Sequence, residues 1–265
     1  MSELVYQDEA ASAYDRAFAH VSTHFLPFLL RAARLAPGQR VLDVATGTGI
    51  AAQAALAVVG PGGHVTAVDV SPAMVNRARQ RLADSPNTSV VVEDGQSLSF
   101  DDGSFDAVLC SLGLMFFPDP ARGLSEFHRV LRPGGFTAVS VNTTPERSYN
   151  GRINVIIARR VPSLVEATAR TFSLGDEARL RSLFERAGFR DVETTTEAHS
   201  FVLPSFEAYF APFEQGGASS GQAYLGLPEV ERRAVREEVR RSVGDTGGPI
   251  AIESELRFAS GHRER

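Results

Sequence analysis

The chain has 265 residues, a length typical of one large domain or two small ones. Its formal net charge is -5, and all 27 basic residues are arginine, so it lacks the basic excess expected of a nucleic-acid-binding protein. A single cysteine, Cys110, excludes an intrachain disulfide and a zinc site built from several cysteines. The chain carries neither a basic, apolar signal sequence nor a run of about 20 apolar residues, so we expect a cytoplasmic protein without a membrane span.

Helical and strand-like segments alternate through the first 141 residues. The patterns predict helices at 8–35, 50–59, 71–83 and 118–131, and strands at 40–45, 64–70, 89–93, 105–111 and 136–141. Pro27 predicts a break or kink in the first helix, and Pro133-Gly134-Gly135 is expected to end the fourth. Strands separated by helices indicate a parallel sheet that is covered by helices on both faces, with right-handed connections.

The remaining residues have a different pattern. They predict helices at 149–169, 176–187 and 228–243, a flexible loop at 216–221, and strands at 191–203 and 250–260. These two strands alternate between polar and apolar residues, which is typical of antiparallel strands at the edge of a sheet. We therefore expect one domain over 1–265, with a helical lid at 8–35 and a helical insertion at 204–249 before the last strand.

A glycine-rich turn follows the first predicted strand and opens a helix. Gly47 and Gly49 have no Cβ, so a ligand can approach the backbone there, and the helix N-terminus attracts anions. Asp69 ends the second strand, where an acid is placed to accept hydrogen bonds from the ribose hydroxyls of an adenosine ligand. Asp94 and Ser111 follow the next two strands at the same edge, so the sequence predicts one cleft that contains all these residues.

The turn alone also fits a nicotinamide dinucleotide site, because residues 47–52 match the pattern G-x-G-x-x-A. Asp43, four residues before the turn, argues against that alternative. Its carboxylate would repel a pyrophosphate, whereas it would attract a cationic group.

Two motifs identify a family. Val41-Leu42-Asp43-Val44-Ala45-Thr46-Gly47-Thr48-Gly49, followed by Arg129-Val130-Leu131-Arg132-Pro133-Gly134-Gly135, closely resembles class I S-adenosylmethionine-dependent methyltransferases. The group that includes the ubiquinone and menaquinone biosynthesis methyltransferases is the most similar. Ala45 departs from the glycine that the family often has at this position.

The resemblance implies a Rossmann-like α/β fold with a seven-stranded, mostly parallel sheet whose last strand is antiparallel. It implies that Asp43 holds the ammonium of the cofactor, that Asp69 binds its ribose, and that Asp94 meets the amino group of its adenine. The full set of residues implied to bind S-adenosylmethionine is Asp43, Thr46, Gly47, Thr48, Gly49, Asp69, Val70, Met74, Asp94, Gly95, Gln96, Ser111 and Leu112. After transfer, the product is S-adenosylhomocysteine.

The acceptor is expected to be a small, mostly apolar molecule that is methylated on oxygen or carbon, such as a phenol, a quinone or a polyketide-like compound. Candidate residues for its pocket are Tyr14, Met115, Phe116, Asn142 and Tyr209. The catalytic base is open, with His20, His24 and Tyr14 as weak candidates, and no histidine has the spacing of a metal ligand. Two alternatives remain, a member of the fold that binds the cofactor without transferring methyl groups and an NAD(P)-dependent oxidoreductase. The protein is expected to be a monomer or a homodimer.

Overall fold

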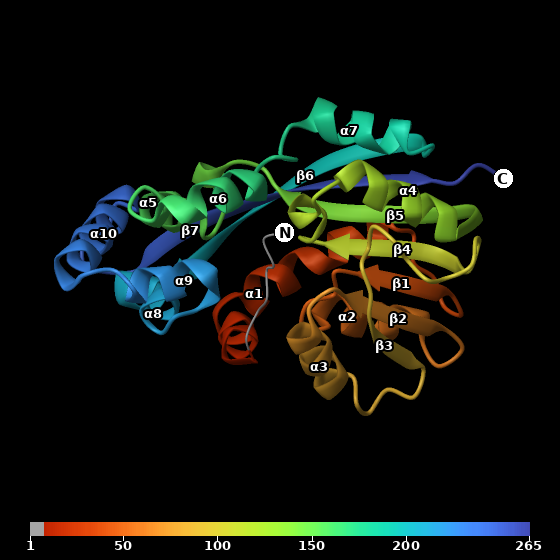
Figure 1. The fold of residues 1–265 in the computed structure, drawn as a ribbon, viewed down its shortest axis with the longest axis horizontal. Coiled ribbons are helices and arrows are strands. Elements are labelled where there is room, and N and C mark those ends of the chain that lie inside the picture. Colours follow the sequence, from red (N-terminus) through yellow and green to blue (C-terminus); the bar gives the residue numbers. More distant parts are fainter. Residues whose placement is uncertain (1–7) are drawn as a thin grey trace.

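The computed structural model describes residues 8–265, except for the side chains of residues 8–18 and 218. Seven strands form one sheet in the order β3-β2-β1-β4-β5-β7-β6 (Figure 1). β7 runs antiparallel to both of its neighbours, and the other neighbouring strands are parallel. The strands are β1 (Arg40–Val44), β2 (His64–Asp69), β3 (Thr88–Val92), β4 (Phe105–Ser111), β5 (Leu131–Asn142), β6 (Arg190–Leu203) and β7 (Ile250–His262). The predicted fold class is confirmed.

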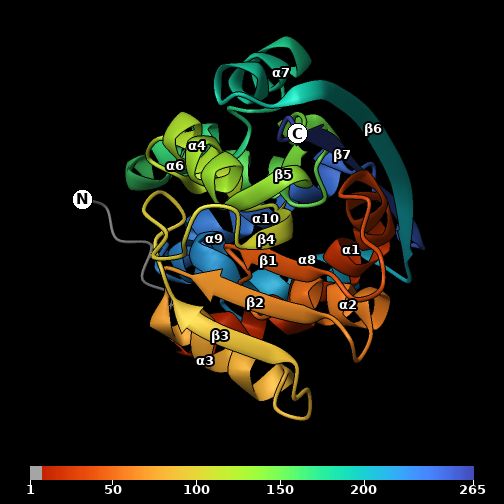
Figure 2. The ribbon, with the colours of Figure 1, turned by 90° about the vertical axis from the view of Figure 1, so that its right-hand side faces the viewer.

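Helices cover both faces of this sheet, and more helices gather beyond the end where the parallel strands finish (Figures 1 and 2). One apolar cluster joins α1 and α2 to α5, α8 and α10, and a second joins α4 and α7 to the other face. The helices are α1 (Asp8–Ala32), α2 (Ile50–Val59), α3 (Pro72–Arg81), α4 (Pro120–Val130), α5 (Gly151–Ala158), α6 (Val165–Thr171), α7 (Glu177–Arg186), α8 (Phe206–Glu214), α9 (Ala218–Leu225) and α10 (Glu229–Ser242). Within the described part of the chain, no helix is long and apolar enough to cross a membrane.

Several predicted elements differ from the observed ones. The predicted helix at 149–169 is instead α5, a 3-10 turn at Pro162–Leu164 and α6, because Pro162 has no N–H to continue a helix. Pro27, by contrast, lies inside a continuous α1. The predicted loop at 216–221 includes the start of α9.

Two strand predictions were also wrong. β5 begins at Leu131, so the segment that we expected to end a helix is part of the strand. Gly134, with φ +78°, donates its N–H to the carbonyl of Arg263, and the N–H of Arg263 binds the carbonyl of Gly135. The segment is thus held by the C-terminal residues. β7, which we expected at an edge, lies between β5 and β6, and its Ile250, Ile252 and Phe258 are buried.

β6 and β7 extend past the rest of the sheet. Their pairing continues from Ala198↔Glu255 to Leu203↔Ile250, whereas β5 stops opposite Leu256. At about 3.4 Å per residue, this two-stranded ribbon reaches roughly 20 Å beyond β5. α8, α9 and α10 connect its two strands, so the ribbon carries these helices to the edge where the parallel strands end (Figure 1).

Candidate functional site

The turn between β1 and α2 is open to a ligand. Ala45, Gly47 and Gly49 all have positive φ, at +55°, +56° and +84°. The N–H of Thr46 binds the carbonyl of Val68, which ties the turn to β2 (2.9 Å). A Cβ added at Gly47 would meet nothing within 4 Å, so space lies beside the backbone here. The order of the strands also reverses between β1 and β4, which is where ligands bind in open α/β sheets.

Asp43 provides an unused acceptor beneath this turn. Its side chain is fully buried, and its Oδ2 accepts a hydrogen bond from Thr46 Oγ1 (2.5 Å). Its Oδ1 is buried and has no hydrogen-bond partner in the described structure. Burial raises the pKa of Asp43 to about 7, although the hydrogen bond from Thr46 and, to a smaller extent, the backbone N–H of Ala52 act in the opposite direction. A buried, unpaired carboxylate oxygen is costly, so its presence here indicates a missing donor or cation.

Asp69 connects the glycine-rich turn to the start of α3. Its Oδ2 accepts from the N–H of Gly47, and its Oδ1 accepts from the N–H of Ser71, both at 2.9 Å. Burial raises the pKa of this carboxyl, while the two backbone donors lower it. Each oxygen keeps a lone pair that can accept a further hydrogen bond. Beside Asp69, the side chain of Val70 is 65% exposed, whereas that of Met74 is buried.

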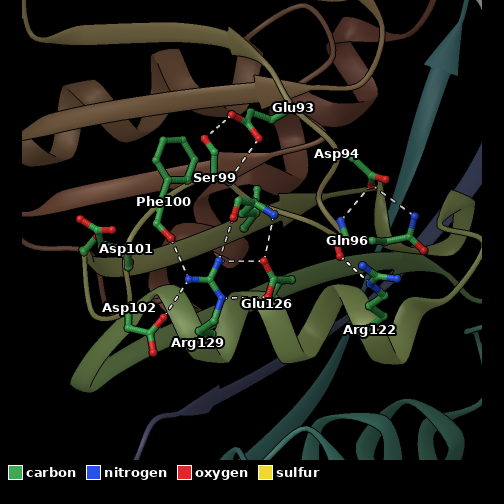
Figure 3. Close-up of polar contacts among 12 residues, drawn as sticks. Glu93, Asp94, Gln96, Ser99, Phe100, Asp101, Asp102, Arg122, Glu126 and Arg129 are labelled. Atoms are coloured by element: carbon green, nitrogen blue, oxygen red, sulfur yellow. Dashed lines mark hydrogen bonds and ion pairs between the residues drawn. The ribbon is translucent and has the colours of Figure 1, made fainter.

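The loop between β3 and β4 carries Asp94, Gly95 and Gln96. Asp94 Oδ1 accepts from both the backbone N–H and the side-chain Nε2 of Gln96, at 2.9 and 3.3 Å. The Gln96 Oε1 accepts from the N–H of Asp119, which caps α4 (2.8 Å). Gln96 therefore orients Asp94 (Figure 3). Gly95 lies against Phe117, where a Cβ would approach the ring to 2.6 Å.

The end of β4 forms the next wall. Leu112 has φ +54°, and its N–H binds Oγ and the carbonyl of Ser140 on β5, at 3.2 and 3.0 Å. Ser111 is half-buried. Met115 is buried in the apolar cluster beneath α4, and Phe116 is half-buried. Thr48, also buried, offers its carbonyl to Arg81 of α3 (2.7 Å).

The candidate residues for the acceptor pocket do not form one cluster, unlike the acids described above. Asn142 ends β5 and accepts from Ser148 Oγ (3.2 Å). Tyr209 is 2% exposed and donates its hydroxyl to the carbonyl of Tyr149 (2.6 Å), so it supports the neighbouring backbone. The side chain of Tyr14 lies outside the described residues.

Both histidine candidates lie edge-on to Phe201 of β6, but they differ in their other ring neighbours. The ring of His20 is exposed and lies edge-on to Tyr149, with 5.3 Å between ring centroids. His24 instead stacks on His199 of β6 (3.7 Å). Burial lowers the pKa of both, and for His24 the neighbouring His199 lowers it further. Of the two, His20 is the one that lies beside the segment following β5.

Sequence reasoning missed the side chains that fix the β3–β4 loop. Arg129 donates to the carbonyls of Leu98 and Phe100 and to Asp102, and Glu126 accepts the N–H of Leu98 (Figure 3). The i, i+3 spacing of Glu126 and Arg129 on α4 was the available signal. Among the described residues, no group of three or more His, Cys, Asp or Glu side chains is arranged to hold a metal ion.

Comparisons with known proteins agree with this geometry. Residues 42–139 match the model of the methyltransferase domain family. The chain is 36% identical over 203 residues to demethylmenaquinone methyltransferase from Clavibacter sepedonicus, covering 70% of this chain and 81% of that protein.

Solved structures show the same fold. Phosphoethanolamine N-methyltransferase 2 from Haemonchus contortus, in complex with phosphomonomethylethanolamine and S-adenosylhomocysteine, has a TM-score of 0.62 and 18% identity. The match covers 98% of this chain and 58% of that one. The [4+2]-cyclase SpnF has a TM-score of 0.59 and 17% identity, covering 92% and 82%.

The open turn, the unpaired Asp43 oxygen and the matched family together define a class I S-adenosylmethionine-dependent methyltransferase, and the chain belongs to that family. Within this class it is similar to the quinone biosynthesis group. S-adenosylmethionine is its cofactor. The unpaired oxygen of Asp43 and the space beside Gly47 fit that molecule, which brings an ammonium group and a sulfonium.

Proposed function

We propose that this methyltransferase transfers the methyl group to oxygen or carbon of a small, mostly apolar acceptor, of the phenol, quinone or polyketide-like class. The observation that carries the proposal is the position of α8, α9 and α10, which the β6–β7 ribbon brings to the edge where the strands end. The relative named demethylmenaquinone methyltransferase supports a quinol-like ring, and the net charge of -5 disfavours a nucleic acid.

The residues around the cofactor would position it and exclude water. Asp43 would hold the ammonium, the turn at Gly47 and Gly49 would hold the methionine part, and Asp69 would hold the ribose. Asp94 would accept from the adenine amino group. A sulfonium methyl is already activated, so transfer is an in-line displacement that depends mainly on alignment.

The acceptor would lie between the end of β4 and the covering helices. Phe116 and Asn142 are the candidates for its wall. His20 is the candidate to accept a proton from a hydroxyl acceptor, because the residue is exposed and partial burial of its ring lowers its pKa, which favours the neutral form. The aromatic side chains of α8 are buried against one another, so they stabilise the group of helices formed by α8, α9 and α10. A cytoplasmic location and a monomeric or dimeric state stay predictions.

The test uses methyl-labelled S-adenosylmethionine with two kinds of acceptor: an extract of the source cells and reduced naphthoquinones with simple phenols. We expect label in the organic-soluble fraction and its loss in Asp43→Asn, which keeps the shape of the side chain but not its charge. Label in the protein or nucleic-acid fraction would contradict a small-molecule acceptor.

A further inference from the structure

The β3–β4 loop has no regular secondary structure between residues 93 and 104, and yet it carries Asp94. Its backbone groups therefore need other partners. Side chains of α4 supply them. Glu126 Oε2 accepts the N–H of Leu98 (2.9 Å), and Arg129 donates to the carbonyls of Leu98 (2.9 Å) and Phe100 (2.7 Å). The helix thus takes the place of a neighbouring strand along this part of the loop (Figure 3).

Glu126 and Arg129 are also bound to each other. Arg129 Nε and Nη2 donate to the two oxygens of Glu126, at 2.9 and 2.8 Å, and Arg129 Nη1 reaches Asp102 (2.8 Å). The hydrogen bond from Arg129 is the main cause that lowers the pKa of Glu126. Arg129 is 30% exposed and Glu126 is 19% exposed, so a paired and fixed geometry is maintained beside the loop.

A second link leads from α4 to Asp94. The N–H of Asp119 donates to Gln96 Oε1 (2.8 Å), and Arg122 Nε donates to the Gln96 carbonyl (2.8 Å). Gln96 in turn donates twice to Asp94 Oδ1. Among the described residues, no hydrogen bond reaches the second carboxylate oxygen, Oδ2, so it can accept from an exocyclic amino group. Both ends of the short segment from Asp94 to Phe100 are therefore fixed by the same helix.

We propose that Glu126 and Arg129 are positioning residues for the adenine of the cofactor, acting through Asp94. This inference rests on the proposed contact between Asp94 and the adenine amino group. Without the two α4 side chains, Leu98 and Phe100 lose three backbone hydrogen bonds, and the loop gains other conformations in which Asp94 points elsewhere. Part of the binding free energy of the cofactor is then used to order the loop, so its affinity falls.

Binding of S-adenosylhomocysteine, measured by titration calorimetry, tests the inference without an acceptor. We expect Arg129→Gln to raise Kd about tenfold, as expected for loss of charge-assisted hydrogen bonds. Glu126→Gln keeps an acceptor for Leu98, so its effect should be about threefold. Arg132→Gln is the matched control, since Arg132 is in the same motif but pairs with Asp106 of β4 (2.7 Å). Its Kd should stay within about twofold of that of the wild type.

Two further measurements separate positioning from a general structural role. In an Asp94→Ala background, Arg129→Gln should add less than about twofold, because the two changes act on the same contact. With S-inosylhomocysteine, which has oxygen in place of the adenine amino group, Arg129→Gln should likewise change Kd less than about twofold. Arg129→Lys keeps the charge without the planar fork and serves if the glutamine variant does not fold.

The inference would be overturned if Arg129→Gln raised Kd by the same factor for S-adenosylhomocysteine and S-inosylhomocysteine. It would also be overturned if the effects of Arg129→Gln and Asp94→Ala on the binding free energy were fully additive. An unchanged Kd in Arg129→Gln would overturn it as well. If Asp94→Ala alone leaves Kd unchanged, the proposed adenine contact itself is wrong, which is a different failure.

Discussion

Asp43 combines complete burial with an oxygen that has no hydrogen-bond partner among the described residues. The sign of its effect on stability follows from its pKa, which rises from 3.8 to about 7 on folding. The folded protein holds this proton more tightly than the unfolded chain does. The contribution of this group therefore lowers the free energy of unfolding as the pH rises from about 4 to 7.

Cofactor binding should show the opposite dependence on pH, because an ammonium group pairs with the ionised carboxylate. Between pH 6 and pH 8 the ionised fraction of a group with a pKa near 7 rises about tenfold. We expect the Kd for S-adenosylhomocysteine to fall by a similar factor, measured by calorimetry in buffers of equal ionic strength. Asp43→Asn should remove most of this dependence. If the variant retains it, another group is responsible.

At the residue scale, the sequence predicted where the acids of the candidate site lie, whereas their roles stay predictions. Asp43 is the last residue but one of β1, Asp69 ends β2 and Asp94 comes two residues after β3, so the parallel sheet places these acids at one edge. The hydrogen-bond partners were not predictable in the same way. Nothing in the local pattern shows that Asp69 accepts from Gly47, or that Gln96 reaches the N–H of Asp119, because both contacts depend on how distant segments pack.

At the scale of elements, the most accurate predictions were helix starts that a Ser-Pro or Asp-Pro pair marks. The predicted starts of α3 and α4 agree with the structure, in which Ser71 and Asp119 cap helices whose first residue is proline. The failures come from tertiary partners. Pro133-Gly134-Gly135 looks like a turn, but the C-terminal residues pair with it and extend β5. β7 alternates like an edge strand because its exposed residues, Ala251 and Glu253, lie in the ribbon that extends past β5, whereas β5 and β6 flank the rest of the strand.

Ion pairs connect α10 to the two arginines that directly follow α5. Glu238 accepts from Arg159 (3.0 Å) and Arg160 (2.7 Å), and its side chain is 26% exposed. We expect Glu238→Ala to lower the free energy of unfolding by about 1 kcal/mol, measured by urea denaturation. The Kd of the Glu238→Ala variant for S-adenosylhomocysteine should not change, because these helices are expected to contact the acceptor and not the cofactor.

Glu237 provides the comparison for this experiment. It lies on the same helix, is 61% exposed, and is 3.9 Å from Arg240. Glu237→Ala should change the free energy of unfolding by less than about 0.5 kcal/mol. A weakened cofactor affinity in Glu238→Ala would show that the group of helices formed by α8, α9 and α10 and the cofactor site are coupled.

For the molecule as a whole, the order of the strands decides where function resides. The reversal between β1 and β4 opens the cofactor cleft, and the β6–β7 ribbon brings a second group of helices to the same edge. The alternation of helices and strands predicted the first feature. The length of the ribbon was not predictable, because it depends on where β5 stops relative to β7.

Because the cofactor is expected to bind the folded chain only, its binding should raise the thermal stability of the whole protein. A ligand at 100 times its Kd stabilises the folded state by about 2.7 kcal/mol. For a chain of 265 residues, this corresponds to a rise in Tm of about 5 °C. We expect that rise with S-adenosylhomocysteine in a thermal unfolding experiment, and none with NADH, whose pyrophosphate would meet the carboxylate of Asp43. Asp43→Ala should lose the rise. A larger shift with NADH than with S-adenosylhomocysteine would contradict the assignment of the cleft, because the two ligands present opposite charges to the same buried oxygen.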